Sequence, residues 1–183
     1  MTWTTPPTFT AGNILTAAQM TILGGDLNAL NDRIQIVRAS SAQNIISSAT
    51  LTNDSALSFS AVTGQAYVGI VAPIFNSASS AIDAKIGWAF PTGTMSFGRV
   101  AMDPAVASGT LGQGIWDAAS AATTASTALS IGVASADTSA LSWFSYNCTS
   151  TGTVNFMWAQ NTLTATNMTR QAGSFLLAIR ISV

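Results

Sequence analysis

The sequence has 183 residues and a formal net charge of −1, with 6 basic residues, 7 acidic residues and no histidine. Charged residues are 7% of the chain, against roughly a quarter of an average soluble domain. This composition excludes a nucleic-acid binder, which needs many cations to neutralise phosphates, and the lack of histidine argues against ordinary acid–base catalysis.

The remaining composition predicts a folded chain made in a reducing compartment. Hydrophobic residues are 48% of the sequence, enough for a core, but they form no run long enough to insert into a membrane. The start of the sequence lacks a basic and an apolar region, so we expect no secretory signal and synthesis in the cytoplasm. The single cysteine, Cys148, is predicted to be a buried structural thiol.

Residues 1–15 are predicted to form an extended arm. Pro6 and Pro7 hold the backbone extended and remove two hydrogen-bond donors, which excludes a strand inside a sheet. The arm carries Trp3 and Phe9, and these rings need a surface to lie against. We therefore expect both to anchor contacts between chains.

Residues 16–40 are predicted to form one amphipathic helix. Thr16 and Gln19 have the spacing of a capping box, which places the helix start after Thr16. Apolar residues follow at alternating spacings of three and four, as on the contact face of a coiled coil: Met20, Leu23, Leu27, Leu30, Ile34 and Val37. This stripe would pack either on the body of its own chain or, as we favour, on other copies or a neighbouring protein.

Residues 41–183 are predicted to form a mainly β domain. Short apolar runs alternate with Ser, Thr, Asn and Gly, and strands are expected at 43–52, 56–62, 66–75, 82–90, 95–102, 127–134, 141–147, 153–160 and 174–182. Strand 82–90 should bury Ile82, Ala84, Ile86, Trp88 and Phe90. Strand 174–182 should bury Phe175, Leu177, Ile179 and Ile181, and because its opposite face begins with Leu176, part of that face is also expected to be covered. The spacing of the strands, without helices between them, indicates an antiparallel β-sandwich or jelly roll.

Residues 103–126 interrupt the strand rhythm and are predicted to form a long loop. Trp116 lies in its middle, and an exposed tryptophan there would be costly. We expect the loop to be docked and Trp116 to anchor a contact between chains.

No pattern in the sequence indicates catalysis, a metal or a cofactor. Asp83 and Lys85 are expected to be a solvated pair on one strand, and Asn53 and Asp54 an ordinary turn. The strand aromatics are expected to be core: Trp88, Trp143, Phe144, Tyr146, Phe156 and Trp158. Two alternatives stay open: a carbohydrate-binding module with a row of exposed tryptophans, and a hydrolase using two Asp carboxylates about 5–10 Å apart.

Several segments resemble one family. The arm WTTPPTFTAG (residues 3–12), followed by LTAAQM (15–20) and DLNAL (26–30), is similar to the N-terminal module of accessory virion proteins of tailed phages that infect actinobacteria. Body segments resemble the same proteins in the same order: LTNDSAL (51–57), IGWAFPTG (86–93), FMWAQN (156–161) and AGSFL (172–176). Thr21 departs from the asparagine that the family often has there.

This resemblance implies a non-enzymatic structural protein of a phage virion. We expect a trimeric capsid decoration protein, anchored by its arm and helix to major capsid or tail proteins. The alternative is a minor tail or tail-fibre protein that binds a receptor such as a host surface glycan. Neither role implies a cofactor, a metal, nucleic acid or membrane insertion.

Overall fold

The computed structural model of the chain describes residues 8, 11–12, 14–79, 82–101, 115–119, 123–124, 131–133 and 137–181. The described elements are one helix, α1 (Ala17–Asn31), and the strands β1 (Ile34–Arg38), β2 (Gln43–Ile45), β3 (Thr52–Ala61), β4 (Ala66–Ala72), β5 (Ile74–Ser77), β6 (Ile82–Ala89), β7 (Gly93–Ala101), β8 (Ile115–Ala119), β9 (Thr123–Thr124), β10 (Ile131–Val133), β11 (Thr138–Cys148), β12 (Gly152–Gln160), β13 (Met168–Arg170) and β14 (Phe175–Arg180).

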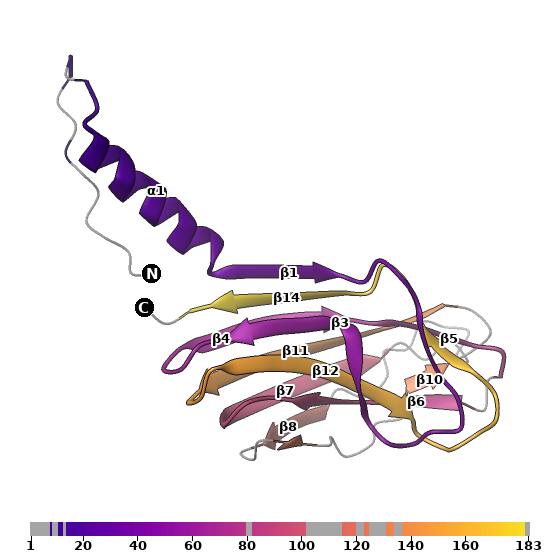
Figure 1. Cartoon of the computed structure of the whole chain (residues 1–183). Coiled ribbons are helices and arrows are strands. Elements are labelled where there is room, and N and C mark those ends of the chain that lie inside the picture. Colours follow the sequence, from indigo (N-terminus) through magenta and orange to yellow (C-terminus); the bar gives the residue numbers. More distant parts are fainter. Residues whose placement is uncertain are drawn as a thin grey trace.

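The start of α1 is where the capping box places it. The Thr16 hydroxyl accepts a hydrogen bond from the Gln19 amide at 3.2 Å, and the Thr16 amide donates to the Gln19 side chain at 2.9 Å. These bonds satisfy two amides that the first turn of a helix leaves without partners. Figure 1 shows α1 joined to the start of β1 and projecting away from the two sheets.

The predicted helix 16–40 is too long. The helix ends at Asn31, and Ile34 and Val37 belong to β1, which pairs with β14 along its whole length. β-Branched residues at 34, 36 and 37 suit a strand, and pairing with β14 satisfies their backbone groups. The boundary between helix and body therefore lies before Ile34, and not at residue 40.

Eight strands form an antiparallel ribbon folded on itself. β3 pairs with β12, β4 with β11, β6 with β10, and β7 with β8. Successive pairs alternate between two sheets, because β12 also pairs with β6 and β11 with β7. The small sheet has the order β10-β6-β12-β3, and the large sheet contains β4-β11-β7-β8. This arrangement is a jelly roll, which confirms the predicted fold class.

Two further groups of strands enlarge the large sheet. β14 pairs with the free edge of β4, and β1 pairs with β14. At the other end, β5 pairs with the first residues of β11 and continues through β13 to β2. The predicted strand 66–75 is two strands, since Pro73 separates β4 from β5. β1, β8, β9 and β13 were not predicted as strands.

Aromatic rings fill the space between the two sheets. Trp88 of the small sheet contacts Phe144 of the large sheet, with ring centroids 4.9 Å apart, and Phe59 stacks on Phe144 at 5.4 Å. Trp158 and Tyr146 are also fully buried. The predicted core aromatics are thus confirmed, and so is the buried face of β6. Trp143 is the exception, because it lies on the opposite side of the large sheet from Phe144.

Candidate interaction surface

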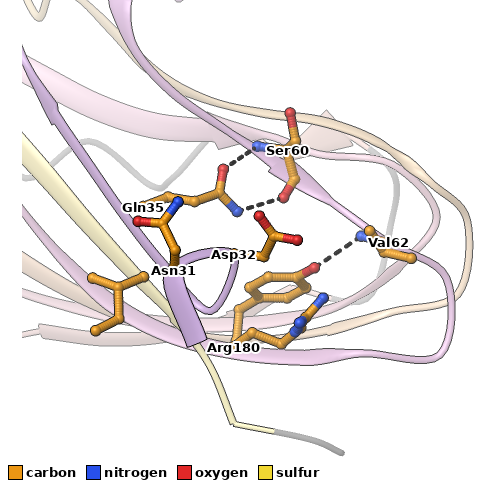
Figure 2. A pocket seen from close by; sticks show the side chains of 8 residues that line it. Asn31, Asp32, Gln35, Ser60, Val62 and Arg180 are labelled. Carbon is orange, nitrogen blue, oxygen red and sulfur yellow. Dashed lines mark hydrogen bonds between the residues drawn. The ribbon is translucent and has the colours of Figure 1, made fainter. Parts of the chain in front are cut away.

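β1 is turned with Gln35 inward and its two isoleucines outward. The Gln35 side chain accepts a hydrogen bond from the Ser60 amide at 3.0 Å and donates to the Ser60 carbonyl at 2.9 Å, so it joins β1 to β3 (Figure 2). Ile34 and Ile36 point the other way and are 46% and 71% exposed. An amphipathic edge strand usually has the reverse pattern. The outer side of β1 is therefore largely apolar, and both isoleucines stay partly exposed in the described part of the chain.

The same surface continues across the large sheet. The register places Ile36 beside Leu177, Leu177 beside Ile70, and Ile70 beside Trp143. Residues directly opposite in antiparallel strands point to the same side. We call the set of side chains on this side the apolar outer face: Ile34, Ile36, Val68, Ile70, Trp143, Phe175, Leu177 and Ile179.

The face of β14 that was predicted to be the core face is its outer face. Leu176 and Ala178 are fully buried against the small sheet, whereas Phe175 is 37% and Ile181 54% exposed. The larger side chains of this strand were predicted to face the core. Both faces of this strand are apolar, as in strands covered on both sides. The larger residues belong to the apolar outer face.

The centre of the apolar outer face is a shallow hollow of about 440 Å³. It is lined mainly by the aliphatic side chains of β4 and β14 and by Trp143. Trp143 lies across Gly98 of β7: a Cβ built on Gly98 would be 2.4 Å from Cε2 and Cζ2 of the indole. Gly98 thus lets the Trp143 ring lie down on the sheet instead of standing up from it.

Gly98→Ala is expected to lower the free energy of unfolding by about 1–3 kcal/mol, because the new methyl group displaces the Trp143 ring. Urea unfolding at fixed protein concentration measures the change. In a Trp143→Ala background the same substitution is expected to be neutral, or stabilising by about 0.5–1 kcal/mol, since alanine suits a strand interior better than glycine. Equal losses in both backgrounds would contradict this contact.

The helix adds a second apolar surface next to the first. Met20, Leu27 and Leu30 of α1 are 54%, 66% and 50% exposed, and Leu23 is half-buried. Leu27 and Leu30 line one hollow of about 530 Å³ together with Ile34 and Ile36. The exposed helix residues and the apolar outer face are therefore continuous.

The structure places the predicted contact residues differently. Leu27, Leu30 and Ile34 share the hollow at the base of α1, whereas Val37 is half-buried on the inner side of β1. Trp116 lies in β8, with Gly98 opposite it in β7, so its segment is a strand and not a loop. Trp3 and Phe9 lie outside the described residues. Sequence analysis missed Ile36, Ile70, Trp143 and Leu177, which the strand register brings together.

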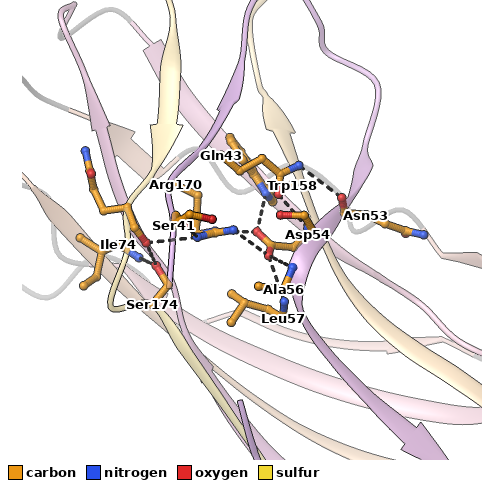
Figure 3. A network of polar contacts seen from close by, with 12 residues as sticks. Ser41, Gln43, Asn53, Asp54, Ala56, Leu57, Ile74, Trp158, Arg170 and Ser174 are labelled. Atoms are coloured by element: carbon orange, nitrogen blue, oxygen red, sulfur yellow. Dashed lines mark hydrogen bonds and ion pairs between the residues drawn. The ribbon is translucent and has the colours of Figure 1, made fainter. Parts of the chain in front are cut away.

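A polar cluster lies on the inner side of the large sheet, between the two sheets (Figure 3). The Arg170 guanidinium donates to both carboxylate oxygens of Asp54, at 2.7 and 3.0 Å, and both side chains are fully buried. Trp158 Nε1 donates to the same carboxylate at 2.9 Å, as do the amides of Ala56 and Leu57. The prediction that Asp54 belongs to an ordinary turn is wrong: it is a buried residue of β3.

Several buried polar groups have partners within the fold. Asp54 and Arg170 satisfy each other, and the Tyr146 hydroxyl donates to the Pro91 carbonyl at 2.8 Å. Burial, with smaller effects from Cys148 and Tyr67, raises the pKa of Tyr146 above its ordinary value. Cys148 is free and buried, as predicted.

One further hollow lies outside the apolar outer face and the polar cluster. Among the described residues, no three metal-ligating side chains come together. A polar hollow of about 370 Å³ lies at the foot of α1, lined in part by Asp32, Gln35 and Arg180 (Figure 2). No helix in the described part of the chain is long and apolar enough to cross a membrane.

Comparisons with known proteins add little. No protein-family model matches the sequence, and no curated protein matches it. Two solved structures, of infectious bursal disease virus strains Gt and Gx, each share 9% sequence identity and a TM-score of 0.20 with this chain. The alignments cover 82% and 81% of this chain, and 38% and 40% of those chains. The chain thus spans about two fifths of their length, and a TM-score this low supports no inference about function.

Proposed function

We propose that the protein is a non-enzymatic structural component of a tailed-phage virion, built from several copies of this chain and attached to other virion proteins by its arm and helix. The resemblance of residues 3–30 to the N-terminal module of accessory phage proteins supports this proposal. It extends to four segments of the body, in the same order.

The observation that carries the proposal is the continuous exposed apolar surface of α1 and the apolar outer face. An isolated helix of 15 residues is marginal in water, and Gly24 and Gly25 weaken this one further. Large exposed apolar patches mark contacts with other proteins. A helix and a sheet face that both need covering favour an assembly subunit over a monomeric catalyst.

The absence of enzymatic activity is part of the proposal. It is supported by the hydrogen bonds that described polar groups make within the fold. The Asp54 carboxylate accepts hydrogen bonds from Arg170, Trp158 and two backbone amides, so its acceptor positions are occupied within the fold. Asp137 accepts a hydrogen bond from Asn76 at the surface.

Within the virion we propose a trimeric capsid decoration protein. The alternative, a minor tail or tail-fibre protein that binds a host glycan, would be favoured by a row of exposed tryptophans. Trp88 and Trp158 are fully buried, and Trp143 lies flat on Gly98. Because two of these three rings are buried, the three do not form a row of exposed tryptophans.

Immunogold labelling of virions with antibody to this protein tests the location. We expect label over the head at many copies per particle, and virions assembled with a chain lacking residues 1–15 are expected to lose most of it. Label confined to the tail end would overturn decoration in favour of the tail alternative. Virions without label would overturn the virion role itself.

A further inference from the structure

We propose that the apolar outer face is the surface through which copies of this chain pack on one another. The inference rests on the proposed role as an assembly subunit and names the site of self-association. It differs from the coiled-coil contact expected from the helix alone, because it assigns the central contact to Ile36, Ile70 and Leu177 of the large sheet. The occupant is a second copy of this chain.

The absence of charge on this face restricts its occupant. The row Ile36, Leu177, Ile70, Trp143 crosses four strands without a charged residue, and Ile34, Ile179 and Val68 form a second apolar row beside it. Arg38, opposite Phe175 at one end of β1, lies at the margin. A partner of average composition would bring charges to this face and lose their hydration. A second copy, with 7% charged residues, brings a matching surface.

The outer sides of β1 and β14 are more apolar than a solvated strand requires. β1 exposes isoleucine at two positions and turns a glutamine toward β3, where two hydrogen bonds hold it. β14 presents Phe175, Leu177 and Ile179 outward while Leu176 and Ala178 already supply its core contact. Strands with two apolar faces are covered on both sides. The described chain covers one side of each strand.

The size of the surface suits a contact between protein subunits. Four strands about 4.8 Å apart, each presenting about 17 Å of its length, give a footprint of roughly 330 Å². The continuous ridge of α1, about 22 Å long and about 10 Å wide, adds roughly 220 Å². The total of roughly 550 Å² is about two thirds of the roughly 800 Å² that each partner buries in a standard-size interface, and the chain's sheet and helix both contribute.

Static light scattering of the full chain at micromolar concentration is the first test. We expect a mass of at least twice 18.8 kDa for the wild type. Ile36→Asp is expected to weaken self-association by roughly a hundredfold or more and to give single chains, because it buries a carboxylate in an apolar contact. Ile46→Asp is the matched control: Ile46 is 58% exposed but lies beyond β2, away from the apolar outer face, so this variant stays oligomeric.

A second measurement avoids disruptive substitutions. Because Cys148 is 3% exposed, an added surface cysteine is the reactive thiol of the chain. Ile36→Cys is expected to react with a maleimide at least tenfold more slowly in the oligomer than after dilution to single chains. Ile46→Cys is expected to react at the same rate in both. Equal rates for Ile36→Cys in both states would overturn this assignment of the interface.

The failure of this inference can be told apart from failure of the proposed function. A wild-type chain that is monomeric at micromolar concentration overturns self-association, whatever immunogold labelling shows. A monomer that binds purified phage heads, and loses this binding on Ile36→Asp, shows that the face binds another virion protein and overturns the assignment to a second copy. Loss of oligomers in both Ile36→Asp and Ile46→Asp, with native circular dichroism, would also overturn it.

Discussion

Arg170→Met is expected to lower the free energy of unfolding by about 3–5 kcal/mol, because it breaks a fully buried ion pair. The guanidinium makes two hydrogen bonds to Asp54 and donates from Nη1 to the carbonyl of Ser41 at 2.6 Å. Methionine fills part of the volume but leaves the Asp54 carboxylate buried without its cation. Urea unfolding, followed by tryptophan fluorescence at fixed protein concentration, measures the loss.

The control is an arginine-to-methionine substitution at an exposed position. Arg38→Met is expected to change the free energy of unfolding by less than about 0.5 kcal/mol. The double variant Asp54→Asn with Arg170→Met removes the uncompensated charge and should recover part of the loss, although the amide fits the donors of Ala56 and Leu57 less well. A loss below about 1 kcal/mol for Arg170→Met would show that the pair is not buried as described.

The two buried tryptophans are expected to respond differently to the loss of the indole N–H. Trp88→Ala and Trp158→Ala should each cost about 3–5 kcal/mol, because both rings are fully buried. Trp158 Nε1 donates to Asp54, whereas Trp88 Nε1 has no hydrogen-bond partner in the described structure. Trp158→Phe is therefore expected to cost about 1–3 kcal/mol more than Trp88→Phe.

Comparing the two phenylalanine variants separates volume from hydrogen bonding. Both changes remove the same atoms from fully buried sites, so the difference between their free energies of unfolding reports the bond to the carboxylate. In the Asp54→Asn, Arg170→Met background the difference should shrink, since the acceptor is no longer charged. Equal costs for the two Phe variants in the wild-type background would contradict the contact between Trp158 and Asp54.

The predictions that the structure confirms rest on residues that are close together in the sequence. The capping box of Thr16 and Gln19 sets the helix start with bonds inside one turn. The alternation of Ile82, Ala84, Ile86 and Trp88 shows their buried side directly, because the opposite face of β6 carries Asp83 and Lys85. The jelly roll could be predicted as a class from the number and spacing of strands.

The predictions that the structure contradicts share one cause: these features depend on contacts between residues that are distant in sequence. The apolar spacing from Met20 to Val37 suits a helix throughout, but Ile34–Arg38 gain more by pairing with β14 near the other end of the chain. On β14 the apolar residues occupy both faces, so alternation could not tell which side faces the small sheet. Asp54 and Arg170 are 116 residues apart, and neither has neighbours that signal a buried pair.

The sequence by itself determined a chain with little charge, a capped helix, a β-rich body and no pattern for catalysis, since these follow from composition and from spacing over a few residues. Only the tertiary structure decided which apolar residues form the core and which form the apolar outer face. The physical reason is register: a side chain on a strand faces the core or the outside according to which residue stands opposite, and that pairing joins segments far apart along the chain.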